Sequence, residues 1–264
     1  MIPRPYIAKW QQHAPWKEFL QVEQDLIISR VLVEIFSDEF LKENLAFRGG
    51  TALHKLYLNP AVRYSEDIDL VQSKPGPIKP IMQRIGEVVS FFEERRTTQI
   101  RGHGAKVFYR FTSEYEEIRM RLKLEINCKE HFNVLNWVDF PFEVESEWFS
   151  GKTEIKTYNI NELLGTKLRA LYQRRKGRDL FDLDYSRQIM ELNYDQLITC
   201  FKEYTTFATG NRPPSKKELL LNIEEKENET VFTGDMEALL RSGIKYNQKA
   251  AFEWFKDELL QDYK

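Results

Sequence analysis

Two aspartates, Asp67 and Asp69, stand two residues apart in the stretch R-Y-S-E-D-I-D-L and could together hold a metal ion. Side chains alternate between the two faces of an extended strand, so a strand over Ile68 to Val71 would place both carboxylates on one side. Carboxylate oxygens are preferred ligands of hard divalent cations. The spacing therefore predicts a Mg²⁺ site, with Mn²⁺ as the alternative metal.

A pair of glycines precedes these aspartates in the stretch F-R-G-G-T-A-L. A short strand over Leu45 to Phe47 is expected to run into a turn at Gly49 and Gly50, with a short helix opening at Thr51. Glycine lets the backbone approach a ligand, and the free N–H groups of a helix N-terminus attract phosphate. Ser65 could contact the same phosphate or only cap the turn. Metal and phosphate sites together indicate nucleotide chemistry.

A second block that could do chemistry lies in a helix predicted over Glu162 to Arg175. Six basic residues and no acidic residue occur between Gly165 and Arg178. Lys167 and Arg174 are two helical turns apart and so share a face. This face could bind an anion, or it could be an ordinary solvated basic surface. Asp179, just after the basic run, could likewise serve a site, pair with Arg175 or cap the next helix, whereas Asp184 is expected at the surface.

These blocks, in this order, resemble the AbiEii/AbiGii toxin family of type IV toxin–antitoxin and abortive-infection systems. The family's members are nucleotidyltransferases of the DNA polymerase beta superfamily. The resemblance covers about residues 41 to 190 and includes G-G-T-A-L, R-x-S-x-D-I-D-L and E-L-L-G-T-K-L-R-A-L-Y-Q-R-R-K-G-R-D-L-F-D-L. It implies a Mg²⁺-dependent transfer of NMP from an NTP to RNA, with the tRNA 3′ end as the expected acceptor. It also implies a cognate antitoxin as a partner.

The same resemblance implies a role for each candidate residue. Asp67 and Asp69 would hold the metal. Lys167 would contact the triphosphate and Asp179 would line the nucleotide cleft, while Arg174 belongs to the same basic block. Superfamily members usually take a third metal-facing carboxylate from a neighbouring strand, and Glu125 is the candidate here; its alternative is a glutamate that merely faces solvent. The β and γ phosphates would be positioned by Gly49, Gly50 and Thr51.

The elements that must position these residues predict an α+β (mixed α/β) fold. A nucleotidyltransferase-like domain over residues 1–157, with a small mixed sheet flanked by helices, would be followed by a helical domain over 158–264 that completes the nucleotide cleft. Apolar periodicity predicts an amphipathic helix over residues 16–38 on one face of the sheet. Further predicted elements are a loop over 73–80, a helix over 81–96, strands over 106–112 and 119–128, and a break at 210–215 in the helical part.

Bulk properties agree with a soluble enzyme. A chain of 264 residues with 42% hydrophobic content can bury a substantial core. Its net charge of −2 makes any nucleic-acid contact local. The chain has no apolar run of the roughly 20 residues that a membrane helix needs, so we expect a cytoplasmic protein with no membrane partner. Cys128 and Cys200 lie in unrelated segments, which argues against a disulfide framework or a thiolate metal site.

Two other interpretations stay open at this point. The first is a small-molecule nucleotidyltransferase of the antibiotic-modifying type, built on the same core. The second is a catalytically inactive scaffold that binds nucleotides, which the intact pair Asp67 and Asp69 argues against. An RNA acceptor should bind with an affinity that falls steeply with salt, whereas a small acceptor should not.

Overall fold

The computed structural model describes residues 1–234, 236, 238–261 and 263, and the chain forms two compact units. Unit 1, Met1–Tyr158, holds all the strands of the sheet together with several helices, and unit 2, Asn159–Lys264, is helical. The predicted α+β fold class is therefore confirmed. The predicted boundary after residue 157 lies one residue before the observed division. Among the described residues, no helix is long and apolar enough to cross a membrane.

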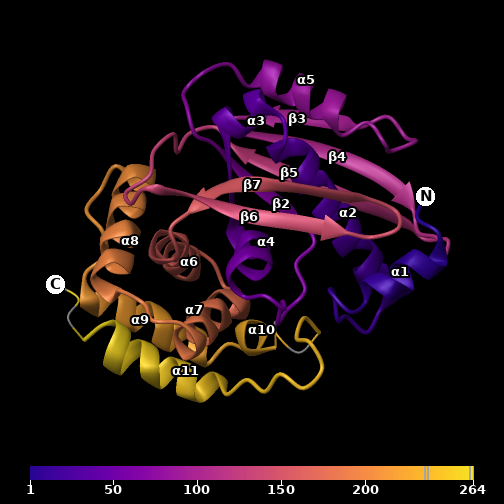
Figure 1. Ribbon diagram of the computed structural model, residues 1–264. Coiled ribbons are helices and arrows are strands. Elements are labelled where there is room, and N and C mark those ends of the chain that lie inside the picture. Colours follow the sequence, from indigo (N-terminus) through magenta and orange to yellow (C-terminus); the bar gives the residue numbers. More distant parts are fainter. Residues whose placement is uncertain (235, 237, 262, 264) are drawn as a thin grey trace. The chain divides into compact units, whose positions relative to one another are not determined.

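A mixed seven-stranded sheet organises unit 1 (Figure 1). Its strand order is β3-β4-β5-β2-β1-β7-β6, in which the pairs β1·β7 and β2·β5 are parallel and the other pairs are antiparallel. The strands are β1 Leu45–Arg48, β2 Ile68–Gln72, β3 Thr97–Arg101, β4 Gly104–Thr112, β5 Arg119–Asn127, β6 Trp137–Glu145 and β7 Ser150–Tyr158. The expected strands β1, β2, β4 and β5 are present, whereas β3, β6 and β7 were not predicted.

Strands β4 and β5 are buried on one face only. Their apolar residues alternate with polar ones, and the apolar face packs toward α5, Ile78–Val88. On that face Tyr109 donates a 3.5 Å hydrogen bond to the Ile85 carbonyl, and its ring stacks on Phe92 with centroids 4.5 Å apart. The period of two in the sequence therefore indicated both the strands and their buried side. The opposite, polar face of β4 and β5 is accessible to solvent.

The helices of unit 1 depart from the sequence prediction in three ways. Helix α2, Phe19–Phe36, is buried around most of its circumference and is not amphipathic. It contacts α1 (Arg4–Trp10), α3 (Glu39–Asn44) and α5 as well as β6 and β7. Helix α5 begins at Ile78, inside the predicted loop, since Pro80 is tolerated in a first helical turn. The same helix ends at Val88, not at Arg96.

Besides α5, unit 1 contains the helices α1 Arg4–Trp10, α2 Phe19–Phe36, α3 Glu39–Asn44 and α4 Gly49–Ala52. Helix α4 continues as a π-helical turn over Leu53–Tyr57.

Unit 2 is built around α6, which packs against α7, α8 and α9. The Asn159 side chain caps α6 by accepting from the Asn161 N–H, at 2.9 Å. The predicted break is confirmed: Gly210, at φ 69°, ends α8 in the left-handed conformation, and Ser215 opens α9 with a capping box. The helices are α6 Ile160–Gln173, α7 Gly177–Ile189, α8 Tyr194–Thr209, α9 Lys216–Glu227, α10 Thr230–Thr233 and α11 Gln248–Trp254.

Glu23 of α2 generates a pH-dependent prediction for unit 1. Its carboxylate is fully buried and accepts from the Ser113 hydroxyl at 2.7 Å and from the Glu114 N–H at 3.4 Å. Burial raises the pKa of Glu23, although both hydrogen bonds oppose the rise. A raised carboxyl pKa contributes stability below the unfolded-state pKa, and this contribution is lost as pH rises through the folded-state pKa. Glu23→Gln should therefore gain stability relative to the wild type as pH rises.

The measurement is the free energy of unfolding in urea at about pH 4 and about pH 7. Glu18→Gln is the control, because Glu18 is an exposed residue just before the same helix. A Glu23→Gln variant whose stability tracks the wild type and the control at both pH values would contradict the prediction.

Candidate active site

The register of the central strands aligns charged residues in one row across the sheet. Arg48 of β1 lies opposite Asp69 of β2, Asp69 lies beside Glu125 of β5, and Glu125 lies opposite Lys106 of β4. Directly aligned residues on neighbouring strands project from the same face. Two carboxylates therefore stand on adjacent strands with a cation at each end of the row.

Asp67 reaches this row through Lys123. The Lys123 ammonium lies 2.8 Å from Asp67 Oδ2 and 3.1 Å from Glu125 Oε2, so it bridges the two carboxylates. Lys106 binds the other oxygen of Glu125 at 3.2 Å. Within the described part of the chain, no group of three or more His, Cys, Asp or Glu side chains is arranged to hold a metal ion. Asp67 and Asp69 remain the candidate ligands, and the metal role of Glu125 stays a prediction.

The electrostatics of these carboxylates fit a site for a hard cation. Burial raises the pKa of Asp69; repulsion from Asp67 and Glu125 adds to the rise, while Arg48 and Lys123 act against it. Burial also acts to raise the pKa of Glu125, but its ion pairs with the two lysines lower it overall. These carboxylates lie close together, and two of them already share the ammonium of one lysine. Mg²⁺ would stabilise such a concentration of negative charge. The donor set therefore fits that metal.

The glycine turn contacts the aspartates directly. Helix α4 begins at Gly49, two residues earlier than expected, and Gly49 has a φ of 80°. A Cβ at Gly49 would lie 2.4 Å from Asp69 Oδ2, so the missing side chain makes room for the carboxylate. The Thr51 hydroxyl donates to the Asp67 carbonyl and lies 2.7 Å from the Ser65 hydroxyl. Thr51 and Ser65 thus tie the turn to Asp67, while the phosphate role of this turn, including Gly50, stays a prediction.

The residues of the second block gather within unit 2. Lys167 is 6% exposed, and its ammonium lies 3.2 Å from Asp179 Oδ1 and 2.9 Å from Asp182 Oδ2. Arg174 donates to both oxygens of Asp179, at 2.7 and 2.8 Å. Burial would raise the pKa of Asp179, but Lys167 and Arg174 lower it overall. Lys167 and Arg174 therefore share Asp179 as a partner, but α6 ends at Gln173, so Arg174 lies outside the helix whose spacing was expected to align them. Asp179 pairs with Arg174 and not with Arg175.

Two expectations about neighbouring residues need correction. Asp184 was expected at the surface but is buried, with its carboxylate bound by Arg187 and Gln188. The basic run was treated as one surface, yet Lys167 is buried whereas Arg175 is exposed and paired with Glu229. Lys167 lies within α6, whereas Arg175 lies in the connection after this helix ends at Gln173, so a run of like charges in the sequence is not one patch in space.

Sequence reasoning missed the cations that hold the carboxylates of unit 1. Lys123 lies two residues before Glu125 on the polar side of an alternating strand, a spacing that could have indicated their contact. Arg48 precedes the glycine turn and binds Glu130 at 2.6 Å, a contact across 82 residues that no local pattern predicts.

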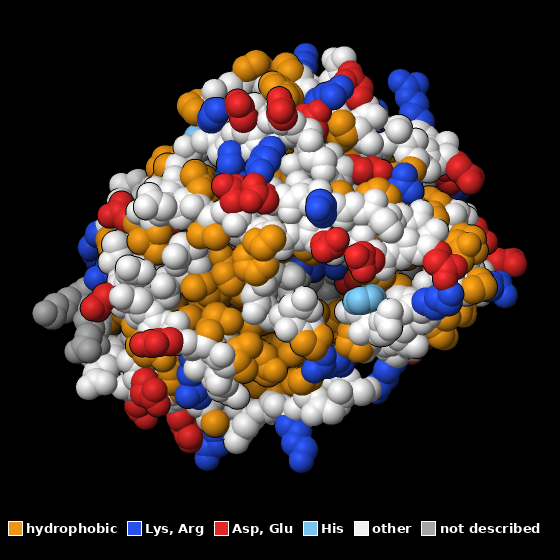
Figure 2. Space-filling view, in the orientation of Figure 1, with side chains coloured by type: hydrophobic (Ala, Val, Ile, Leu, Met, Phe, Trp, Pro, Cys, Tyr) orange, Lys and Arg blue, Asp and Glu red, His pale blue; other side chains and the backbone are white. Residues whose placement is uncertain are grey.

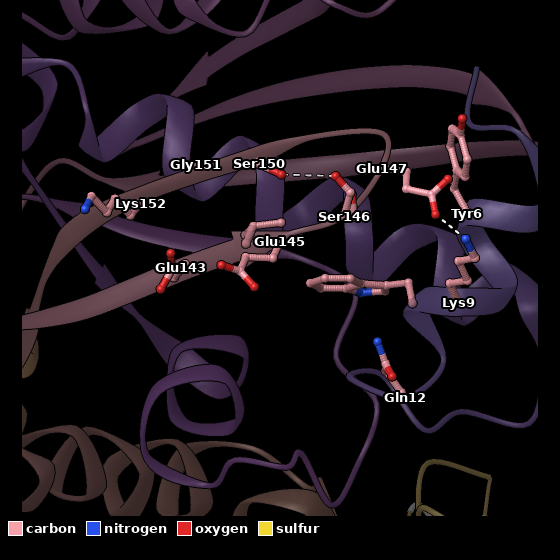
Figure 3. Close-up of a pocket in the computed structure, with 12 residues that line it drawn as sticks. Tyr6, Lys9, Gln12, Glu143, Glu145, Ser146, Glu147, Ser150, Gly151 and Lys152 are labelled. Carbon is pink, nitrogen blue, oxygen red and sulfur yellow. Dashed lines mark hydrogen bonds and ion pairs between the residues drawn. The ribbon is translucent and has the colours of Figure 1, made fainter.

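A pocket elsewhere in unit 1 contains none of these residues. It has a volume of about 660 Å³ and lies between α1 and the β6–β7 hairpin, lined by Tyr6, Trp10, Glu143 and Glu145 among others (Figure 3). Lys9 and Glu147 form an ion pair at its rim. On the face drawn in Figure 2, acidic and basic side chains are interspersed, in keeping with the near-neutral charge. The candidate site is therefore defined by the charged row on the sheet and not by this pocket.

Comparison with known proteins identifies the family. The family described as nucleotidyl transferase AbiEii toxin, Type IV TA system, matches residues 30–258. The chain belongs to this family. It is thus a member of a nucleotidyltransferase toxin family of type IV toxin–antitoxin systems, and family membership implies a nucleotide substrate and a cognate antitoxin. The resemblance noted in the sequence is confirmed over a longer range than expected.

Solved structures show the same fold. The nucleotidyltransferase toxin MenT4 of Mycobacterium tuberculosis is 18% identical, with a TM-score of 0.69, covering 98% of this chain and 90% of that one. JHP933 of Helicobacter pylori is 17% identical, with a TM-score of 0.53, covering 92% of this chain and 94% of its own. No curated protein sequence matches the chain at a significant level.

The close contact between Gly49 and Asp69 predicts a stability difference between two glycine variants. Gly49→Ala and Gly102→Ala each place a side chain at positive φ, which costs about 1–2 kcal/mol. Only at Gly49 does the new Cβ collide with a neighbour, because nothing lies within 4 Å at Gly102. Gly49→Ala should therefore lose about 1–3 kcal/mol more in urea unfolding. Equal losses in the two variants would show that Asp69 moves aside freely.

The buried position of Lys167 predicts that its removal destabilises unit 2. Lys167→Ala would leave Asp179 and Asp182 without one shared cation in a buried site, and we expect a loss of about 3–5 kcal/mol in the free energy of unfolding. Arg175→Ala is the control, because Arg175 is 60% exposed and its ion pairs are worth at most about 1 kcal/mol. NTP affinity, measured on the folded fraction, tests the triphosphate role separately. A Lys167→Ala variant as stable as the control would refute the structural role.

Proposed function

We propose that this chain is a Mg²⁺-dependent enzyme that transfers NMP from an NTP to RNA, with the tRNA 3′ end as the preferred acceptor. The observation that carries the proposal is the position of Asp69 beside Glu125 on the sheet, with Gly49 against the Asp69 carboxylate and Lys123 joining Glu125 to Asp67. Membership of a nucleotidyltransferase toxin family supports the reaction class. The choice of RNA as acceptor rests on the family resemblance, and a binding affinity that falls steeply with salt is the behaviour that tests it.

In this proposal each residue of unit 1 has a defined task. Asp67 and Asp69 would hold the metal, and Gly49 keeps the Asp69 carboxylate in its close position. The Thr51 hydroxyl fixes the backbone of Asp67 by donating to its carbonyl, and the Ser65 hydroxyl hydrogen-bonds to the Thr51 hydroxyl. When bound, the metal would offset negative charge on the phosphates and lower the pKa of the attacking hydroxyl.

The cations around the carboxylates would offset their mutual repulsion. Lys123 holds Asp67 and Glu125 by ion pairs, and Arg48 opposes the rise in the pKa of Asp69. Lys123 must give up its place between the carboxylates if Glu125 joins the metal as a third ligand. The contact of Lys167 with the triphosphate remains a prediction, because Asp179 and Asp182 engage its ammonium.

The direct test is incubation of purified protein with each of the four α-labelled NTPs, Mg²⁺ and whole-cell RNA. We expect label from at least one NTP to enter RNA of tRNA size. Omission of Mg²⁺, with Mn²⁺ as a replacement in a parallel reaction, tests the metal requirement. Label that enters no RNA with any NTP would refute the proposed acceptor.

Asp69→Asn should reduce this transfer by more than about 100-fold, because loss of a metal ligand is expected to exceed the 10- to 100-fold effect typical of residues behind the ligands. The substitution keeps the size of the side chain and removes a repelled buried charge, so the fold should be retained. Glu66→Gln is the control, since Glu66 is exposed and adjacent to Asp67. Near-normal transfer by Asp69→Asn, with unfolding and circular dichroism unchanged, would place the metal site elsewhere.

A further inference from the structure

One surface of unit 1 gathers positive charge, and apart from Lys106 and Lys123 the site described above does not use it. It is the solvent-facing side of β3, β4 and β5, here called the basic sheet face. Register places on this side the basic residues Arg101, Lys106, Arg110, Arg119, Arg121 and Lys123. The structure describes every residue of these three strands, and Glu125 is the one acidic residue among them on this side.

Several of these cations are not neutralised by neighbouring acids. Glu125 engages Lys106 and Lys123, and Glu94 engages Arg119. Among the described residues, no carboxylate lies within ion-pair distance of the remaining arginines, Arg101, Arg110 and Arg121. Arg101 and Arg121 are exposed, and Arg110 is partly exposed. The face therefore presents uncompensated positive charge to solvent in a chain whose net charge is −2.

An aromatic ring lies in the middle of this charge. Phe108 of β4 is partly exposed on the polar side, and the Arg121 guanidinium carbon lies 5.1 Å from its ring centroid. Arg110, two residues along the same strand, donates to the Thr97 hydroxyl at 3.2 Å. Exposed aromatic rings and arginine planes are surfaces on which unpaired bases stack, while arginines bind phosphates.

The basic sheet face is continuous with the candidate catalytic carboxylates. Phe108 lies directly opposite Lys123, and Lys123 contacts Asp67. Neighbouring strands are about 4.8 Å apart, so Phe108 on β4 stands about 10 Å from the position of Asp67 beside β2. A polynucleotide lying over Phe108 could therefore place its end at the carboxylates.

We propose that the basic sheet face binds the single-stranded 3′-terminal segment of the RNA acceptor, with Arg110 and Arg121 on its phosphates and Phe108 against a base. The identity of the ligand as RNA rests on the proposed function. An acidic protein would match the charge, but it would gain nothing from a ring opposite Lys123 and beside the carboxylates that act on an RNA end. The face is also distinct from the basic run of unit 2, for which the sequence indicated an anion site or a solvated basic surface.

The experiment measures fluorescence anisotropy of a labelled single-stranded RNA of about 12 nucleotides at several salt concentrations, without NTP. Arg110→Ala/Arg121→Ala should lower affinity at least about tenfold and reduce the slope of log affinity against log salt by about 1.4, because each lost phosphate contact removes about 0.7. Phe108→Leu keeps the apolar bulk and should lower affinity about fivefold or more, whereas Phe108→Tyr should retain it.

The matched control is Lys79→Ala/Arg84→Ala, which also removes two positive charges. Both residues lie on α5, which packs toward the opposite face of the sheet, so RNA affinity and salt slope should stay at the wild-type values. Thermal unfolding of every variant confirms that the fold is intact. Equal affinity of the wild type and the arginine variant, an equal loss in the control, or no binding of RNA by the wild type would overturn the inference.

Failure of this inference can be told apart from failure of the proposed function. RNA binding that depends on Arg110 and Arg121, in a protein that labels no RNA, would refute the transfer reaction and support the binding face. Transfer to RNA that is unchanged in Arg110→Ala/Arg121→Ala would support the reaction and overturn the binding face. NTP affinity should be the same in the wild type and this variant, because neither arginine belongs to the phosphate turn.

Discussion

Repulsion among closely placed carboxylates is the constraint on which the site in unit 1 depends. At an effective dielectric near 20, two like charges about 4 Å apart cost on the order of 4 kcal/mol. Strand pairing keeps Asp69 beside Glu125 despite this cost, because the opposite face of β2 and β5 is a buried apolar layer that fixes the register. Lys123 bridges two of the carboxylates and Arg48 acts on Asp69, so each of the three carboxylates is stabilised by a nearby cation.

This constraint explains features that lie outside the row itself. A carboxylate pressed against the glycine turn requires a residue without Cβ, which accounts for Gly49. Hydroxyl contacts from Thr51 and Ser65 hold the chain where it enters β2, so that Asp67 cannot move away from Asp69. The sheet supplies register and the turn supplies close approach, and neither alone would hold both aspartates at one place.

Local patterns predicted the parts of the fold that depend on local chemistry. Alternation predicted β5, and the glycine pair predicted the turn after β1, since both signals lie within a few residues. Strand β6, at the edge of the sheet, and strand β7, beside it, were missed because they carry few buried residues, and Pro141 and Gly151 obscure their alternation. The burial of α2 could not be predicted, because it depends on contacts with helices and strands distant in sequence. For the same reason the pairing of Lys123 with Asp67 could not be predicted before the parallel register of β2 and β5 was known.

The two groups of basic residues show why geometry, and not sequence, decides where charge can bind a ligand. In unit 2 the basic run begins in α6, where Lys167 is buried, and continues past the end of this helix. Lys167 and Arg174 balance Asp179 and Asp182. In unit 1 the basic residues follow antiparallel strands, and the period of two sends each to the same solvent-facing side. The basic residues of unit 2, which are clustered in the sequence, are thus largely neutralised by nearby carboxylates. The basic residues of unit 1, which are dispersed in the sequence, form a continuous surface. Positive charge that is not already held by aspartates is the charge that can attract a polyanion, and on the strands of unit 1 it adjoins the carboxylates that would act on the polyanion's end.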